Sequence, residues 1–165
     1  MNVIGLTLNS ILAIIERLQT ANFPEPVGSI EKCDLKKLES SLKIPFQRPT
    51  KSDSFEDFVE KAALLFFLIT ENHCFENSNK RIAVGALVTF ADINGFNLGI
   101  NEVSLYGLSI AITYLSKYGL NNEAVFEIEV VLRGHLVKKP GKKTSKLELR
   151  KLRKEFKDFM ISRQV

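Results

Sequence analysis

Apolar residues recur at helical spacing along most of the chain, and runs that alternate apolar with polar residues are few. This pattern predicts an all-α protein, a bundle of helices built around one central helix pair. The first stripe ends before Pro24, and two more lie on either side of residues 73–81. The three stripes are Leu8, Ile11, Leu12, Ile15 and Leu18; Phe58, Ala62, Leu65, Phe66 and Ile69; and Ala83, Ala86, Leu87 and Phe90.

Two further helices are expected after Gly95. Asn101 is a suitable N-cap for the first, which Gly119 would end. Its apolar face comprises Leu105, Leu108, Ile112 and Leu115. The second would begin at Asn121 or Asn122 and end near Gly134, with Phe126, Val130 and Val131 facing inward.

The stretch after Asp34 changes character within a few residues. Asp34 would cap a short helix that runs through Leu42. Pro45 and Pro49 follow, and prolines remove backbone donors and restrict the residues before them, so we expect an extended segment over residues 44–49.

Composition fits a single domain. The chain has 165 residues, of which 45% are hydrophobic, enough for a sizeable core without disulfides or metal. Cys33 and Cys74 form neither a disulfide framework nor a metal-binding spacing. Because no apolar run is long enough for a bilayer and no signal-peptide pattern is present, we expect a cytoplasmic protein without a membrane partner.

Charge divides the chain unevenly. Residues 133–165 carry 12 basic and 3 acidic side chains, whereas residues 1–132 carry 11 and 16. We therefore expect a helical domain over residues 1–136 and a basic extension over residues 137–165, with a hinge at residues 138–143 and an amphipathic helix beyond it. That extension, residues 138–165, would either bind nucleic acid or dock on the body by its apolar stripe, and the second alternative is favoured.

Residues 73–81, with the sequence His-Cys-Phe-Glu-Asn-Ser-Asn-Lys-Arg, carry the candidate chemistry. They lie between two predicted helices, and the second helix would begin near Ser78 or Asn79. The first amides of a helix have no partner within it, so they can bind an anion. Lys80 and Arg81 add full positive charges there. Asn77 and Ser78 are residue types that often cap helices instead.

His73 stands at the other side of this loop, at the end of the preceding helix. An imidazole gains and loses a proton near neutral pH, which suits a general base. A lone histidine at a helix end is more often a cap or a surface residue. Its neighbours in the loop favour the catalytic interpretation. His135, the other histidine, has no comparable surroundings.

The run resembles the signature of the Fic/Doc family, commonly written His-x-Phe-x-Asp/Glu-Gly-Asn-Gly-Arg. His73, Phe75, Asn79 and Arg81 match it directly, and Lys80 is similar to the variant of the Doc-like, death-on-curing branch. Similarity extends over roughly residues 28–95. The resemblance implies a Fic-type helical bundle with a short extended flap before the motif, in which Phe46, Gln47 and Arg48 would bind the target protein. A plain connector is the equally weighted alternative for this segment.

The resemblance also implies a transferase that moves part of ATP or another nucleoside triphosphate onto a hydroxyl of a target protein. His73 would take the hydroxyl proton. Ser78, Asn79, Lys80 and Arg81 would contact phosphate, with Asn79 alternatively orienting the loop. Asn77 stands where the family carries an acidic ligand for Mg²⁺, so metal binding would be weakened.

Departures from the family pattern bear on which group is transferred. Ser78 replaces a glycine, and its hydroxyl would either crowd the phosphate or bind it. Lys80 in place of the second glycine, and Val84 where nucleotidyl-transferring members have an arginine, favour phosphate transfer over AMP transfer. A self-inhibitory Ser/Thr-x-x-x-Glu-Gly/Asn pattern is not found, so restraint would come from a separate antitoxin.

Three functions therefore stay open. The favoured one is a Doc-like phosphotransferase, plausible as the toxin of a toxin–antitoxin pair. The second is an AMP-transferring Fic enzyme. The third is a binding module in which Asn77 and Ser78 have abolished turnover and the basic extension docks a partner.

Overall fold

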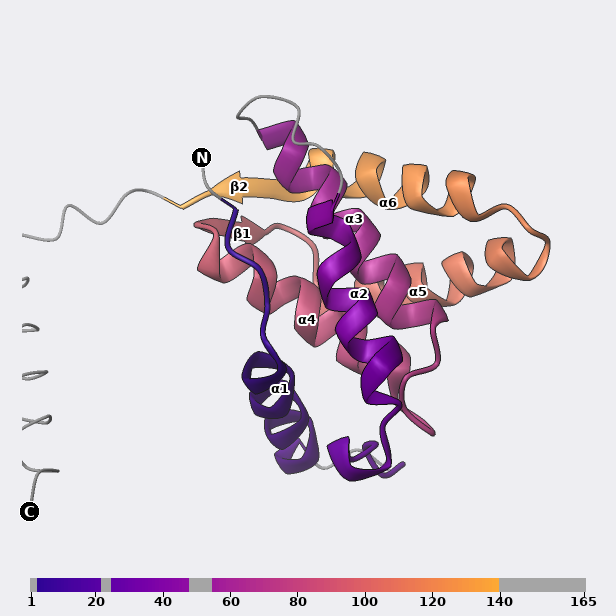
Figure 1. Ribbon diagram of the computed structural model, residues 1–165. Coiled ribbons are helices and arrows are strands. Elements are labelled where there is room, and N and C mark those ends of the chain that lie inside the picture. The colour runs from indigo at the N-terminus through magenta and orange to yellow at the C-terminus, as the bar shows by residue number, and fades with distance from the viewer. Residues whose placement is uncertain (1–2, 22–24, 48–54, 140–165) are drawn as a thin grey trace, which may run out of the picture.

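The computed structural model describes residues 3–21, 25–47 and 55–139. Six α-helices account for most of this part of the chain, together with one short 3₁₀ helix and two three-residue strands (Figure 1). The all-α prediction is confirmed. In chain order the elements are α1 (Leu8–Thr20), η1 (Ile30–Lys32), α2 (Leu35–Gln47), α3 (Phe55–Glu71), α4 (Asn79–Ile93), β1 (Phe96–Leu98), α5 (Glu102–Lys117), α6 (Asn121–His135) and β2 (Leu136–Lys138).

Helix α3 is the centre of the bundle. It packs against α2, α4, α5 and α6, and most of its side chains are buried. Phe58 on this helix stacks between two other rings, with centroids 5.1 Å from Phe90 of α4 and 4.5 Å from Phe96 of β1. These contacts join three elements in one aromatic cluster. Because α3 and α4 are packed so firmly, the loop between them starts and ends at fixed points.

Helix α1 approaches α4 closely at one residue. Gly85 of α4 has no side chain, and a Cβ added there would lie 2.6 Å from Cγ2 of Ile14. Ile14 is buried at this contact. Glycine at this position therefore allows α1 to lie directly against the helix that follows the loop, despite its cost in helix propensity.

The extended segment expected over residues 44–49 is wrong for the residues that the structure describes. Helix α2 continues through Pro45 to Gln47, while Arg48 and Pro49 lie outside the described residues. Pro45 is buried, and the ring of Phe46 packs edge-on against Phe90 with centroids 6.3 Å apart. Burying these two side chains offsets the helical hydrogen bond that proline removes.

The hairpin of α5 and α6 follows the predicted boundaries, and α5 turns its predicted face, with Leu105 and Ile112, into the core, but α6 does not bury its predicted face. Asn101 caps α5 by accepting a hydrogen bond from the Ser104 amide at 2.8 Å, and Gly119, with φ +77°, follows its last turn. On α6 the expected inward residues Phe126 and Val130 are 59% and 46% exposed. The buried face instead comprises Ala124, Ile128 and Leu132. That prediction was wrong because two apolar stripes on α6 have the same helical spacing, and spacing alone does not choose between them.

The two short strands join the end of the described chain to its middle. Strands β1 and β2 pair antiparallel, with Phe96 opposite Lys138 and Leu98 opposite Leu136. The Lys139 amide continues the contact by donating to the Gly95 carbonyl at 2.8 Å. Lys138, expected to begin a hinge, thus belongs to a strand. Residues 140–165 lie outside the described part, as does the predicted amphipathic helix. Within the described residues, no helix has the length and apolar character needed to cross a membrane.

Candidate functional site

Residues 72–78 form the loop that joins α3 to α4, called here the motif loop. Helix α3 ends at Glu71, where the Asn72 amide still donates to the Leu68 carbonyl, and α4 begins at Asn79. The predicted loop between two helices is therefore present. Because the loop is short, His73 lies only a few residues before the first turn of α4.

His73 is exposed and lies two residues beyond the end of α3. Its φ angle is +46°, in the left-handed region that side chains other than glycine seldom adopt. The imidazole makes no hydrogen bond or ion pair with any described residue. The ring is thus accessible to a substrate. His135, by contrast, lies at the end of α6 with Nδ1 2.9 Å from the Val131 carbonyl oxygen.

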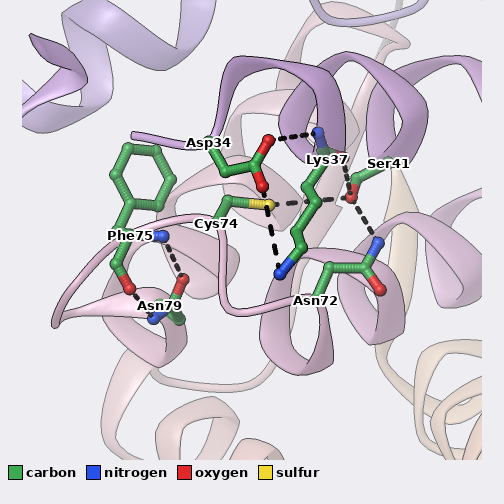
Figure 2. Close-up of polar contacts among 7 residues, drawn as sticks. All are labelled: Asp34, Lys37, Ser41, Asn72, Cys74, Phe75 and Asn79. Atoms are coloured by element: carbon green, nitrogen blue, oxygen red, sulfur yellow. Dashed lines mark hydrogen bonds and ion pairs between the residues drawn. The ribbon is translucent and has the colours of Figure 1, made fainter. Parts of the chain in front are cut away.

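The Asn79 side chain makes two hydrogen bonds across the motif loop. Its Oδ1 accepts from the Phe75 amide at 3.0 Å, and its Nδ2 donates to the Phe75 carbonyl at 2.7 Å (Figure 2). Both residues are buried. Of the two roles that the sequence left open for Asn79, this geometry supports orienting the loop, since both ends of the amide are engaged.

The first turn of α4 is uncapped. Ser78 occupies the N-cap position with φ +66° and makes no side-chain capping bond. Its hydroxyl instead lies 3.2 Å from the Pro26 carbonyl and 3.1 Å from Asn77 Oδ1. The first helical bond is donated by Ile82 to the Ser78 carbonyl at 2.9 Å. The amides of Asn79 and Lys80 make no hydrogen bond with another described residue, so they can bind an anion.

Two cations stand beside these amides. Lys80 is half-buried and forms no ion pair with a described residue. Arg81 is only 13% exposed in its side chain and is held by the loop after α1: Nη1 donates to the Glu25 carbonyl at 3.2 Å and Nη2 lies 3.4 Å from the Glu25 carboxylate. Nη2 also donates to Ser78 Oγ at 2.9 Å. Arg81 is therefore already oriented toward the start of α4.

Residues 25–34, called here the covering segment, run along the motif loop. At one end Glu25 and Pro26 contact Arg81 and Ser78; at the other the Asp34 amide donates to the Cys74 carbonyl at 2.8 Å. Between them, a Cβ on Gly28 would lie 3.0 Å from the Asn77 carbonyl oxygen. The sequence identified these residues only as a loop and the start of a helix. No local signal reveals their contact with the motif, because it joins positions about fifty residues apart in the chain.

Asn77 is exposed, with its Oδ1 accepting from Ser78. No group of three or more His, Cys, Asp or Glu side chains lies together as a metal site in the described part of the chain. Mg²⁺ bound to nucleotide phosphates needs only one or two protein oxygens. One exposed amide oxygen beside the start of α4 fits such an ion as a weak, neutral ligand.

The two thiols lie near the His73 end of the loop. Burial, then the neighbouring Cys74 and Asp34, raises the pKa of the Cys33 thiol to about 11. Burial likewise raises the pKa of Cys74, whose Sγ lies 3.9 Å from Ser41 Oγ. Both groups therefore keep their protons at neutral pH and are poor nucleophiles there.

A groove of about 570 Å³ opens beside Arg81. Its floor is α4, with Val84, Gly85 and Val88, and its walls are α1 and the start of α5, which contributes Tyr106. Glu25 and Arg81 lie at one end. The groove thus joins an apolar cavity, large enough for a nucleoside, to the cationic end of the motif.

Of the predicted site residues, His73, Asn77, Ser78, Asn79, Lys80 and Arg81 all lie on the motif loop or the first turn of α4. Phe46 and Gln47 lie on the last turn of α2, with Phe46 packed against the core, and Arg48 is outside the described residues. The arrangement combines an accessible imidazole with the first amides of α4 and with two cations, Lys80 and Arg81. This combination is suited to moving a proton next to a bound phosphate.

Comparison with known proteins agrees with this geometry. A model of the Fic/DOC family matches residues 5–91, more than half of the chain, and members of this family are typically transferases. Neither the curated proteins nor the solved structures gave a significant match. The matched residues include the motif loop, most of α4 and the covering segment. The chain belongs to the Fic/DOC family.

Proposed function

We propose that this protein is a Doc-like phosphotransferase that moves the γ-phosphate of ATP, or of another nucleoside triphosphate, to a hydroxyl of a target protein. The observation that carries the proposal is the uncapped start of α4. The amides of Asn79 and Lys80 make no hydrogen bond with the described residues and lie beside the cations of Lys80 and Arg81, next to the loop that carries the exposed His73.

In this proposal the phosphates bind at the start of α4. The amides of Asn79 and Lys80 hold them together with the side chains of Lys80 and Arg81. Two cations at a helix start are unfavourable because the start carries partial positive charge, and a bound phosphate dianion offsets this repulsion. The nucleoside lies in the groove along α4, whose volume of about 570 Å³ leaves room for it. The Glu25 carboxylate, 84% exposed, yields its place on Arg81 to phosphate.

The transfer follows from these positions. The target hydroxyl oxygen attacks the γ-phosphorus, and His73 takes the hydroxyl proton as the new O–P bond forms. The bond between the γ-phosphorus and the β,γ-bridging oxygen breaks, and its electron pair leaves on the nucleoside diphosphate. Arg81 and the helix amides stabilise the charge that develops on the phosphoryl oxygens.

A divalent cation would neutralise part of the phosphate charge when bound. Asn77 would contact it, with a neutral amide oxygen where the family pattern has a carboxylate. We therefore propose a Mg²⁺ requirement that is weaker than usual for the family. A toxin role, with a separate antitoxin as restraint and a cytoplasmic location, completes the proposal.

Labelled ATP tests the transferred group directly. The purified protein is incubated with a bacterial lysate and ATP that carries label on the γ-phosphate or on the α-phosphate. We expect γ-label on protein, reduced by about a hundredfold or more in His73→Ala, the usual scale for losing a general base. His135→Ala is the matched control, since His135 lies at the end of α6 and not on the motif loop.

The other outcomes select the alternatives. Protein-bound α-label identifies an AMP-transferring Fic enzyme. No label from a folded protein leaves the binding module, in which Asn77 and Ser78 have abolished turnover. Unchanged transfer by His73→Ala removes His73 from the role of base.

A further inference from the structure

His73 needs support that its own side chain does not supply. A residue other than glycine in the left-handed region is disfavoured by about 1–2 kcal/mol, and such a conformation persists only where surrounding contacts determine it. His73 has φ +46° and its ring makes no hydrogen bond with the described residues. The contacts that hold this conformation must therefore belong to its neighbours in the chain.

Both neighbours of His73 are attached to α2. Asn72 Nδ2 donates to Ser41 Oγ at 2.8 Å, and Cys74 Sγ lies 3.9 Å from the same oxygen. The Asp34 amide, just before α2, donates to the Cys74 carbonyl at 2.8 Å. Figure 2 shows the Asn72 and Cys74 side chains converging on Ser41.

The hydrogen bonds at Ser41 have one consistent direction. Ser41 is fully buried, and its hydroxyl donates to the Lys37 carbonyl one turn earlier, at 2.8 Å. Its oxygen lone pairs remain to accept hydrogen bonds from the side-chain amide of Asn72 and from the protonated Cys74 thiol. One buried oxygen on α2 thus fixes the chain immediately before and immediately after His73.

We propose that Ser41, acting through Asn72 and Cys74, is a positioning residue that holds the left-handed backbone at His73 and so directs the imidazole toward the attacking hydroxyl. Ser41 touches no substrate in this arrangement. The inference rests on the proposed role of His73 as general base, but the orientation of the ring is measurable without activity.

Ser109 provides a matched control. It is also fully buried on a helix, and its hydroxyl also donates back to its own helix, to the Tyr106 carbonyl at 2.6 Å. Among the described residues, its hydroxyl has no contact with the motif loop. Ser109→Ala therefore removes the same atom from the same kind of environment without touching His73.

The first measurement is NMR on the full chain. The ring signals of His73 and its amide–Hα coupling report the side-chain surroundings and the φ angle. We expect Ser41→Ala and Asn72→Ala to shift or broaden the His73 signals and alter the coupling, while Ser109→Ala leaves both unchanged. Unchanged His73 signals in Ser41→Ala, or equal changes in Ser109→Ala, would overturn the proposal.

The second measurement separates positioning from general stability. Displacing a catalytic group by about an ångström can reduce rate by up to a hundredfold. We expect Ser41→Ala to lower kcat by at least about tenfold, with KM for ATP within about twofold, because phosphate binds at the other end of the loop. The double variant Ser41→Ala/Asn72→Ala should lose much less than the product of the single losses.

The kinetic measurements can also overturn the proposal. A larger KM with unchanged kcat, or fully multiplicative losses, would contradict a shared positioning role. If the unaltered protein transfers no label at all, the proposed function fails, whereas the NMR comparison still decides whether Ser41 holds His73.

Discussion

The two ends of the motif loop are held in different ways. At the His73 end, a fully buried serine on α2 binds Asn72 through a 2.8 Å hydrogen bond. At the Arg81 end, the guanidinium contacts a carbonyl at 3.2 Å and a carboxylate at 3.4 Å, both from Glu25, whose side chain is 84% exposed.

This difference separates two tasks. A buried hydrogen bond is costly to leave unmade, so the His73 end is fixed by the fold. An exposed ion pair contributes little, so an incoming anion can replace it at small cost. His73, the proposed proton acceptor, is thus fixed before a substrate binds. Arg81 instead keeps a contact with Glu25 that an incoming phosphate can replace.

The largest expected effect tests the internal closure of the loop. Asn79→Ala removes both hydrogen bonds to the buried Phe75 backbone, and we expect a loss of about 2–4 kcal/mol in unfolding free energy from two unsatisfied groups. Denaturant unfolding measures it. The control is Asn101→Ala, which removes an exposed N-cap and should cost about 1 kcal/mol. Equal losses would show that the closure adds nothing beyond a cap.

Thiol alkylation tests whether the His73 end is closed in solution. With a pKa of about 11, Cys33 has far less thiolate at pH 8 than a free cysteine, so iodoacetamide should react about a hundredfold more slowly. The rate should rise with pH up to about pH 11, because the thiolate fraction grows as protons are lost. Mass spectrometry of the modified peptide measures this rate. Reaction at the rate of a free thiol would mean that this end opens readily.

A negative charge added at Asn77 tests whether this residue contacts the metal ion. Asn77→Asp restores a hard anionic oxygen, and we expect about tenfold tighter apparent Mg²⁺ binding in the presence of ATP. Titration of transfer activity against Mg²⁺ measures it. Asn122→Asp, which adds the same charge at the exposed start of α6, is the control and should have no effect. Unchanged metal affinity in Asn77→Asp would leave Asn77 with only its contact to Ser78.

The smallest effect tests exchange at the Arg81 end. Glu25→Gln keeps the backbone contact but removes the carboxylate, so triphosphate should bind about two- to fivefold more tightly, in line with an exposed ion pair. The gain should diminish at high salt. Glu31→Gln removes the same charge from the covering segment away from Arg81. A loss of affinity in Glu25→Gln would show that Glu25 supports the site instead of competing for it.

Much of the site follows from local patterns. The apolar stripes place α3 and α4 on either side of the motif loop, and residue types predict the N-cap position at Ser78, because both depend on residues a few positions apart. What Ser78 does there is not local. Its hydroxyl contacts the Pro26 carbonyl and the Arg81 guanidinium and makes no capping bond to the helix amides.

The errors share one cause. Pro45 indicated an end to α2, yet burial of Pro45 and Phe46 carries the helix on to Gln47. Phe126 and Val130 had the spacing of a buried face, but α6 buries Ala124, Ile128 and Leu132. In each case, packing against elements distant in the sequence outweighed a local preference, for ending the helix at proline or for burying one apolar stripe.

The sequence by itself determined the helices, the loop and the reactive residue types, because helical periodicity and helix-start chemistry act over a few consecutive residues. Only the tertiary structure decided that Ser41 lies beside Asn72 and that Glu25 reaches Arg81. These contacts join residues 31 and 56 positions apart. They form because burial of the core packs α2 against α3 and α1 against α4, and no short-range pattern encodes which side chains then meet.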